Sequence, residues 1–459
     1  MAQEQQEAVL SGIGRRSFIR SAALTGAGLA LAPAILRAQD AGKSDALNIA
    51  LIGAGRQGKI LLGDALKITD VPLRVKAVCD MWEYSSRRAQ AYCKAAKQET
   101  KFYATYQEML AQESDLDAVI IATPDFVHHE HTNACLNAGL HVYCEKEMSN
   151  DLSLARSMVE TARKTGKLLQ IGHQRRSNPY YKHAYNLMHK EKFFGDIVTM
   201  NGQWNQRKPI TPLPSNMLSK YGMTKDYLAR YGYGSMEEFY EWRWFEKYSG
   251  GPMTDLGSHQ IDVFNWFQRM NPSSVYAVGG NQFALSEAKA NNAGYTPESF
   301  DHTIAIYEYK QPWGVALGSY QVDLRTSHGL FFEQFMGPKG SLIISELTKK
   351  NAFFKEASAA APEWLDEASQ AETKADEGGM KIDPQRSKAA EGHAGQLTAE
   401  MNKNPHQLHI ENFLKAIRGE AELTCPAEEA YAVAVSVLKA NQAAKAGGKI
   451  EFKPEDFKA

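Results

Sequence analysis

Ala46-Leu-Asn-Ile-Ala-Leu-Ile52, a run dense in aliphatic side chains, leads directly into Gly53-Ala-Gly55-Arg-Gln-Gly58, and residues 59–66 continue with apolar side chains at helical spacing. A buried strand, a Gly-x-Gly-x-x-Gly turn and a helix, in this order, are typical of the first unit of a dinucleotide-binding fold. In such a unit Gly53 permits the tight turn, Gly55 lets the backbone approach the pyrophosphate, and Gly58 allows close helix–strand packing. The stretch therefore predicts a dinucleotide with its phosphates at the helix N-terminus; the alternative is a glycine-rich turn without a ligand.

The second predicted strand, 73–79, ends at Asp80. An acidic residue at a strand end, about 20 residues or slightly more past the glycines, can hold both hydroxyls of a ribose. Because its charge repels a 2′-phosphate, Asp80 favours NAD over NADP. NADP remains the alternative, because three arginines lie nearby in the sequence: Arg56, Arg87 and Arg88.

Three further strands are predicted over 118–122, 141–144 and 168–171, with helices over 129–138 and 153–165 between them. Strands that alternate with helices indicate a parallel, doubly wound sheet, and ligands bind at the carboxyl ends of its strands. We therefore predict an α/β Rossmann domain over residues 45–172. The predicted cofactor site comprises Gly53, Gly55, Arg56, Gln57, Gly58, Asp80, Thr123, Pro124, His128, Glu145 and Lys146.

Residues 173–459 have a different pattern. A helix is predicted from Pro179 to about Lys192, and mostly alternating strands follow, separated by Gly, Pro and Asn. This pattern predicts an α+β domain with an open, mostly antiparallel sheet that packs one face on helices. The predicted strands are 196–204, 274–283, 302–309, 315–322, 330–336, 341–345 and 450–452, and late helices are predicted over 406–417 and 426–444.

Two segments of this second part have unusual composition. Residues 205–248 are rich in Trp, Tyr and Phe. Aromatic faces stack on sugar rings, so a carbohydrate-facing loop is one interpretation; an oligomer contact or an extra core is the other. Residues 356–404 are rich in Ala, Glu, Lys and Gly with few large apolar side chains, which predicts a flexible surface loop.

The stretch Gly250-Gly251-Pro-Met-Thr-Asp255-Leu-Gly-Ser-His259-Gln-Ile-Asp262 is a second distinctive motif. Asp255 and His259 are four residues apart, which on a helix places them on one face. Taken alone, Asp255 could be a helix cap and His259 a buried core histidine. No metal site is predicted, because ligands are too few and the chain has no His-Glu-x-x-His.

With these motifs, most of residues 46–459 resembles the Gfo/Idh/MocA family, the relatives of glucose-fructose oxidoreductase and inositol dehydrogenase. Family members end the fourth strand with Glu-Lys-Pro, where this chain has Glu145-Lys146-Glu147. The resemblance implies that Lys146 lies near the nicotinamide and the reacting hydroxyl. It also implies that Asp255 and His259 hold substrate hydroxyls and supply the acid/base group.

The resemblance further implies that residues 172–176 border the substrate pocket; a polar interdomain linker is the alternative for this stretch. It also implies that the second sheet mediates dimerisation and that the C-terminal tail packs back on the nucleotide-binding domain. Oxidation of a secondary alcohol needs a base for the hydroxyl proton, and histidine can act near neutral pH. The predicted catalytic residues are Lys146, His259 and Asp255. The predicted substrate contacts are Arg175, Tyr180, Asp255 and His259.

The N-terminus is predicted to carry an export signal. Arg15 and Arg16 precede a weakly hydrophobic run, 21–36, and Ala38 is a plausible cleavage position. Paired arginines before such a run predict a twin-arginine signal over residues 1–38, the bacterial export route for folded proteins, and a location in the periplasm or otherwise outside the cytoplasm. A retained anchor and a chance basic helix are the alternatives. Because a protein exported folded can carry its cofactor, we expect NAD, with NADP as the alternative, to be tightly bound.

Composition excludes several classes. The chain has 459 residues, 52 Lys and Arg, 53 Asp and Glu, and a net charge of −1. This balance argues against nucleic-acid binding, and the sequence after residue 40 lacks an apolar stretch of about 18 residues that would insert in a membrane. Five widely spaced cysteines without a Cys-x-x-Cys argue against a disulfide framework and predict buried thiols.

The function predicted from the sequence is an exported NAD(P)-dependent oxidoreductase that acts on a sugar, polyol or sugar derivative. One alternative is an NAD-retaining glycoside hydrolase that works by oxidation, elimination, hydration and reduction, with His259, Tyr180 or Tyr181 as the extra base. A second alternative is a non-catalytic nucleotide or sugar sensor. A third is a structural or interaction protein that uses the aromatic segment as a docking surface. Expected partners are a carbohydrate substrate, the twin-arginine machinery and further copies of the chain in a dimer or tetramer.

Overall fold

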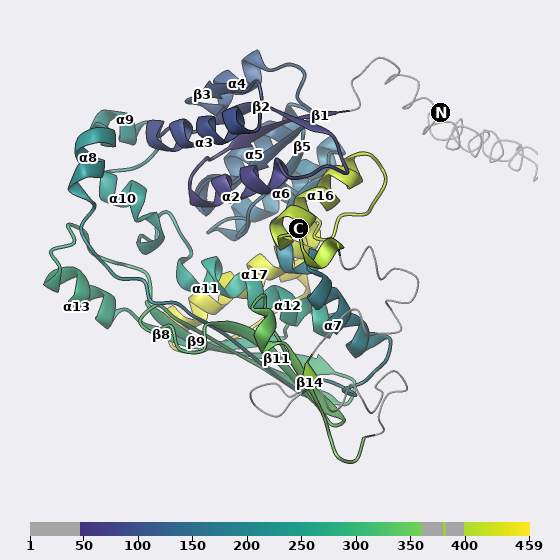
Figure 1. Cartoon of the computed structure of the whole chain (residues 1–459). Helices are drawn as coiled ribbons and strands as arrows, with labels where there is room; N and C mark the ends of the chain where they lie inside the picture. The colour runs from purple at the N-terminus through teal and green to yellow at the C-terminus, as the bar shows by residue number, and fades with distance from the viewer. Residues whose placement is uncertain (1–45, 360–379, 382–398) are drawn as a thin grey trace, which may run out of the picture. The chain divides into compact units, whose positions relative to one another are not determined.

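Six parallel strands form the first sheet, in the order β3-β2-β1-β4-β5-β6 (Figure 1). The computed structural model describes residues 46–359, 380–381 and 399–459, and residues 47–459 belong to one compact unit. The predicted export signal, 1–38, lies outside the described residues. The strands are β1 Leu47–Ile52, β2 Leu73–Cys79, β3 Lys101–Tyr103, β4 Ala118–Ile121, β5 His141–Cys144 and β6 Leu169–Ile171.

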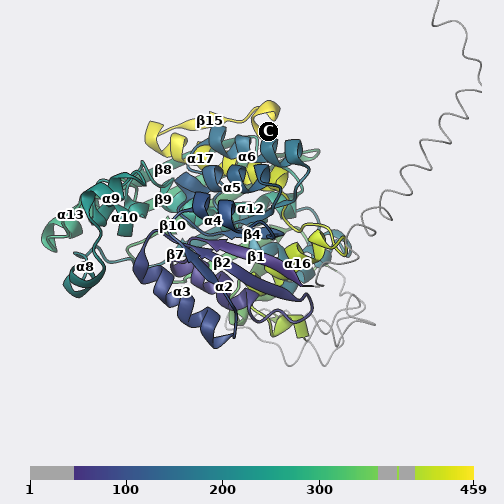
Figure 2. The same cartoon turned by 90° about the horizontal axis from the view of Figure 1, so that it is seen from above.

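Helices cover both faces of this sheet, because consecutive side chains of its strands are apolar and point to opposite faces. Ile49 and Leu51 pack in one apolar cluster with helices on one face, whereas Ala50 and Ile52 pack in a second cluster on the other. Figure 2 shows helices on both faces of the sheet. The first face carries α2 Arg56–Ala65, α3 Glu83–Ala95 and α16 Pro405–Ile417; the second carries α4 Tyr106–Gln112, α5 His128–Asn137 and α6 Leu152–Thr165. The predicted doubly wound sheet is thereby confirmed.

The second sheet has nine strands, in the order β14-β13-β12-β11-β7-β10-β9-β8-β15. All neighbours are antiparallel except β7 and β10, which confirms the predicted mostly antiparallel sheet. The bounds are β7 Thr199–Asn205, β8 Ser274–Gly280, β9 His302–Gln311, β10 Gly314–Asp323, β11 Phe331–Gly337, β12 Gly340–Ile344, β13 Ala352–Lys355, β14 Met380–Lys381 and β15 Lys449–Glu451.

One face of the second sheet packs on helices α12 Gly257–Gln268 and α17 Ala427–Ala446 (Figure 1). Along β9 the burial alternates, so Ala305, Tyr307 and Tyr309 are buried under these helices while Ile304 and Ile306 face outward. Helix α17 also contacts α6 of the first layer, and α7 Pro179–His189 contacts β12. The two sheets therefore share one continuous apolar core.

Several elements differ from the sequence-based expectation. The edge strand β3 and helix α4 were not predicted, because three residues are too few to carry a periodic pattern. The strand expected over 274–283 ends at Gly280, and α13 Gln282–Ala290 follows. Within the segment predicted to be a flexible loop, Met380–Lys381 pairs with β13; most of the rest of that segment lies outside the described residues.

The aromatic segment 205–248 folds into short helices with an apolar core. These are α8 Ser215–Tyr221, α9 Lys225–Ala229, α10 Met236–Tyr240 and the 3-10 turn η3 Trp242–Trp244. Leu228, Tyr233 and Tyr248 are buried in a cluster with Trp82 of the first domain. Of the interpretations left open, an extra core describes this arrangement.

All five cysteines are buried and unpaired, as predicted. Among the described helices, none combines the length and the apolar character that crossing a bilayer requires. Within the same residues no group of three or more His, Cys, Asp or Glu side chains is arranged to hold a metal ion.

Candidate active site

The glycine turn after β1 has the shape that a dinucleotide phosphate requires. Gly53 has φ +88°, and a Cβ there would lie 2.7 Å from the Ala122 carbonyl carbon. A Cβ on Gly58 would lie 1.8 Å from the Gly53 oxygen, whereas a Cβ on Gly55 would meet nothing within 4 Å. Gly55 begins α2 without a side-chain cap, so the first N–H groups of the helix face the open space beside it. This cradle fits a pyrophosphate.

Asp80 lies beside this turn, at the end of β2. Its carboxylate accepts hydrogen bonds from the N–H groups of Ala54 and Trp82, both at 2.7 Å. Burial raises the pKa of Asp80 to about 6, although the two N–H donors oppose the shift. The ionised carboxylate has further lone pairs, so it can accept ribose hydroxyls at neutral pH.

The ends of β4 and β5 are tied to each other and to the glycine turn. The His128 ring contacts the carbonyl oxygens of Thr123 and Glu147 at 2.7 and 2.8 Å. Glu145 is buried and accepts a hydrogen bond from the Gln57 amide at 3.1 Å. Thr123 leads into Pro124, which starts a short 3-10 turn, η1 Asp125–Val127. The predicted cofactor residues thus share one edge of the sheet, with Glu145 and His128 fixing the loops.

Lys146 meets Asp255 across 109 residues of sequence. Its ammonium donates to the Asp255 backbone oxygen and lies 3.3 Å from the carboxylate Oδ1. Arg243 donates to the other carboxylate oxygen at 2.7 Å. Burial acts to raise the pKa of Asp255, but Arg243 and Lys146 outweigh it and hold that pKa well below its usual range. Asp255 is therefore an anion throughout the physiological range.

Glu147 stands where the resembling family has proline, and the Lys146–Glu147 peptide bond is cis. The Glu147 carboxyl is buried and accepts from the Met148 N–H at 2.7 Å. Burial, opposed by that N–H and by Lys146, raises the pKa of Glu147 to about 8. At neutral pH this carboxyl is therefore mainly protonated.

Asp255 and His259 lie on consecutive helices rather than on one. Asp255 ends α11 Gly251–Asp255, Leu256 interrupts the helix, and His259 is in the first turn of α12. The His259 ring stacks on Trp204 of β7, with 5.4 Å between ring centroids and 22° between planes. Burial, then the positive charges of Lys146 and Arg175, lower the pKa of His259 well below its usual value. His259 is thus a neutral imidazole, a weaker base than an exposed histidine, whose Nδ1 has no hydrogen-bond partner.

The polar stretch after β6 forms η2 Gln174–Ser177, which contacts the second sheet through Arg175. Arg175 is buried and forms an ion pair with Glu333, while its Nη2 lies 3.7 Å from Glu346. Its Nε and Nη2 have no hydrogen-bond partner, so this side can still bind a ligand. Tyr180 is half-buried against the core.

His173 and Tyr181 are two further buried side chains near Arg175 that could be considered as bases. His173 is buried, and both ring nitrogens lack a hydrogen-bond partner. Burial lowers its pKa to about 4, so it is neutral. The Tyr181 hydroxyl donates to Glu333 at 2.8 Å, and burial raises its pKa well above the usual value. Tyr181 is therefore unsuited to be the extra base.

Sequence reasoning missed Arg243, Trp204 and the role of His173. Arg243 and Trp204 belong to the aromatic segment and its border, where no spacing rule selects single residues. His173 lies within the quoted stretch 172–176, and its position after a parallel strand was the available signal.

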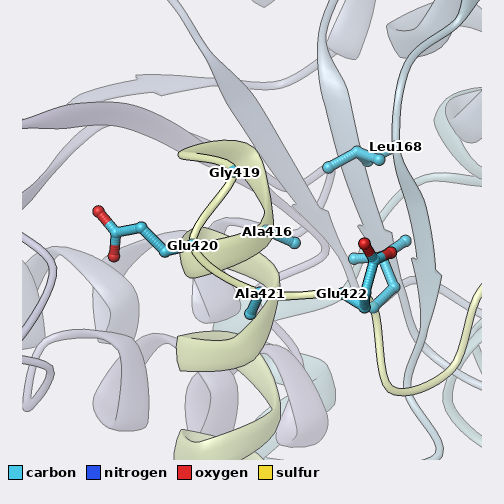
Figure 3. Close-up of a pocket in the computed structure, with 7 residues that line it drawn as sticks. Leu168, Ala416, Gly419, Glu420, Ala421 and Glu422 are labelled. Carbon is cyan, nitrogen blue, oxygen red and sulfur yellow. The ribbon is translucent and has the colours of Figure 1, made fainter.

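A separate pocket lies between Leu168 and the turn after α16, lined by Ala416 and residues 419–423 (Figure 3). Leu168 precedes β6, so the pocket is at the amino end of that strand. The residues described above are at the carboxyl ends. The pocket therefore lies apart from the candidate active site.

The phosphate cradle and Asp80 lie at the carboxyl edge of the first sheet, and Lys146 of the same edge meets Asp255 of α11; this arrangement suits a dinucleotide bound beside groups that can donate and accept a proton. The sequence model of an oxidoreductase family's NAD-binding Rossmann fold matches residues 47–173, and the model of its C-terminal alpha/beta domain matches residues 227–452. The chain belongs to this family, Gfo/Idh/MocA.

Individual relatives are more distant. The chain is 36% identical over 141 residues to 4-carboxy-2-hydroxymuconate-6-semialdehyde dehydrogenase from Sphingobium sp., covering 30% of this chain and 42% of that protein. It is 29% identical over 263 residues to D-glucoside 3-dehydrogenase from Escherichia coli, covering 56% and 65%. The match thus spans less than two thirds of each relative.

Among solved structures, the WlbA dehydrogenase from Bordetella pertussis, in complex with NADH and UDP-GlcNAcA, superposes with a TM-score of 0.65 at 19% identity. The superposition covers 90% of this chain and 99% of that one. At this identity the likeness establishes the shared fold.

Proposed function

We propose that this protein is an NAD(P)-dependent oxidoreductase that transfers a hydride between a secondary hydroxyl of a sugar, polyol or sugar derivative and a tightly bound cofactor. The observation that carries the proposal is the meeting of Lys146 with Asp255, beside a neutral His259, at the sheet edge that holds the phosphate cradle. The site suits a substrate with uncharged hydroxyls, because Lys146 is paired with Asp255 and Arg175 is paired with Glu333.

Each residue has a distinct role in this proposal. Lys146 donates to the reacting oxygen, and Asp255 and Arg243 fix the ammonium. His259 accepts the hydroxyl proton because it is neutral and has an unpartnered Nδ1. The bound nicotinamide supplies the hydride acceptor when the alcohol is oxidised.

The test supplies the purified protein with a panel of sugars and polyols as hydride donors and a second sugar as hydride acceptor, and follows both the redox state of the bound NAD(P)(H) and the product formed. We expect Lys146→Met to lower kcat by about 10²–10⁴-fold while NADH binding persists. The matched control, Lys164→Met on the exposed side of α6, should keep wild-type turnover. Wild-type turnover by Lys146→Met would refute the assignment, and NADH binding without turnover on any substrate would favour the sensor.

One observation favours a second candidate, the redox-neutral glycoside hydrolase. Besides His259, the buried imidazole of His173 is neutral and has no hydrogen-bond partner on either ring nitrogen. In such a reaction one base takes the hydroxyl proton and another takes the C–H proton beside the transient carbonyl, after which the leaving group departs, water adds and the hydride returns. Release of 4-nitrophenol from nitrophenyl glycosides without net NADH formation distinguishes this candidate.

Export and cofactor retention belong to the same proposal. The paired Arg15 and Arg16 and the apolar run after them support a twin-arginine signal, and so a periplasmic protein that keeps its cofactor. Purified from the periplasm and then denatured, the protein should release about one NAD(H) or NADP(H) per chain. The Arg15→Lys/Arg16→Lys variant should stay in the cytoplasm; equal export of both forms would contradict the signal.

We also propose that a second copy of the chain covers the outer face of the nine-stranded sheet. Tyr276 pairs with Ile306 and Val278 with Ile304 across β8 and β9, and these four side chains are 42–49% exposed. A contiguous apolar patch of this kind marks an interface. Light scattering should give at least twice the chain mass for the wild type and a lower mass for Ile304→Lys/Ile306→Lys, with Tyr92→Lys as the exposed control.

A further inference from the structure

The aromatic segment connects the cofactor side of the first sheet to the catalytic carboxylate. We call residues 206–250, between β7 and α11, the bridging segment. It contains α8, α9, α10 and η3, and α8 and α9 lie beside α3 in Figure 1.

One end of the bridging segment holds the loop after Asp80. The Tyr227 hydroxyl donates to the Met81 carbonyl at 2.8 Å, and the Trp82 indole N–H donates to the Tyr221 carbonyl at 2.8 Å. Trp82 also contacts Phe239, with 5.5 Å between ring centroids. The Trp82 backbone N–H also donates to the carboxylate of Asp80, the proposed ribose acceptor. The bridging segment therefore binds Met81 and Trp82, the two residues that follow Asp80.

The middle of the bridging segment packs on the loop after β4. Phe126 lies 5.7 Å from the Tyr233 ring and 5.1 Å from the Tyr248 ring, centroid to centroid. Tyr233 and Tyr248 are almost fully buried. Phe126 follows Thr123 and Pro124, so a second strand-end loop that borders the cofactor site is also held.

The other end reaches the catalytic group and the second sheet. Arg243 donates to the Asp255 carboxylate at 2.7 Å, and its carbonyl accepts from Ser299 at 3.2 Å. The same segment therefore contacts the ribose-binding loop, the β4 loop and the residue that positions Lys146.

We propose that the bridging segment is the outer wall of the cofactor site and retains the dinucleotide between turnovers. The inference rests on the proposed function and adds the residues that make the cofactor slow to leave. The two strand-end loops must move apart from the second domain for a dinucleotide to exit at the ribose end. The bridging segment opposes that movement because it joins the loops to the second domain through buried aromatic side chains and hydrogen bonds.

The experiment measures how fast NADH leaves. Protein loaded with NADH is mixed with excess NAD⁺ in a stopped-flow instrument, and the loss of bound-NADH fluorescence gives the dissociation rate. We expect Tyr227→Phe, which removes one hydroxyl, to raise the rate about 3–10-fold, the equivalent of one hydrogen bond. Trp82→Leu, which also removes the ring contacts, should raise it by more than tenfold.

Tyr92→Phe is the matched control, because Tyr92 is an exposed residue on α3; its rate should equal the wild-type rate. Wild-type rates for both Tyr227→Phe and Trp82→Leu, with thermal unfolding showing folded protein, would overturn the inference and leave the proposed function intact. A wild-type protein that binds neither NADH nor NADPH would overturn both.

Discussion

At the residue scale, the site depends on the carboxylate of Asp255, which pairs with two cations. Asp255 contacts both Lys146 and Arg243, but the side chain of Lys146 is 9% exposed and that of Arg243 is 44% exposed. Lys146 follows β5 at the edge that carries the proposed cofactor residues, whereas Arg243 lies in η3 of the bridging segment, so Arg243 acts through Asp255. Arg243 is thus a positioning residue.

Removing Arg243 should change the pH dependence of catalysis. Since Arg243 is one of the two cations that hold the pKa of Asp255 down against burial, Arg243→Gln lets that pKa rise. The acid limb of kcat should therefore move to higher pH, with kcat at neutral pH reduced about tenfold at most and Arg243→Lys restoring part of the shift. A pH–rate profile checks this, with the exposed Arg207→Gln as control; an unmoved acid limb would contradict the role.

Trp204 fixes the plane of the His259 ring. Its indole lies between two rings, since it stacks on Phe331 as well, at 4.6 Å and 25°. A phenyl ring preserves this stack and an aliphatic side chain does not. We expect Trp204→Phe to keep near wild-type kcat and Trp204→Leu to lower kcat about 5–10-fold with little change in KM. Equal kcat for the two variants would show that the stack does not orient His259.

At the scale of elements, the end of β2 makes cofactor affinity depend on pH. Asp80, with a pKa of about 6, is mainly ionised at pH 7 and protonated below pH 6, and the charged form is the better acceptor for ribose hydroxyls. NADH should therefore bind more weakly as the pH falls through about 6. Titrations of NADH fluorescence between pH 5 and 8 test this, and Asp80→Asn should bind weakly with a flat profile; a flat wild-type profile would exclude Asp80 as the acceptor.

The elements that periodicity could predict are those with long or alternating apolar runs. The strand–turn–helix of β1 and α2 is specified locally, because only glycine fits at positions 53 and 58. The break at Leu256 and the short β3 depend on tertiary packing, which no spacing reveals. For the same reason Lys146, Asp255 and His259 could be named from motifs, whereas Arg243 and Trp204 join them only through the fold.

At the scale of the whole molecule, buried ion pairs and α17 connect the two sheets. Arg175 and Arg176 follow the last parallel strand and pair with Glu333 of β11 and Asp262 of α12. These arginines lie a few residues from His173, so they set the position of the first sheet's strand ends relative to the catalytic helix. Loss of the Arg175–Glu333 or the Arg176–Asp262 ion pair should therefore alter how the cofactor side of the site is placed relative to helix α12.

The contribution of one such ion pair to stability can be measured at Arg176, because this residue pairs with one buried and one exposed carboxylate. The Asp262 side chain is 1% exposed, whereas that of Glu429 is 54% exposed. Asp262→Asn leaves a buried guanidinium without its buried counter-ion, which should lower the free energy of unfolding by about 3–5 kcal/mol. Glu429→Gln removes an exposed partner and should cost about 1 kcal/mol or less. Urea unfolding of both variants checks the difference; similar losses would mean that the Asp262 pair does not hold the two sheets together, and that α17 and the shared apolar core do so instead.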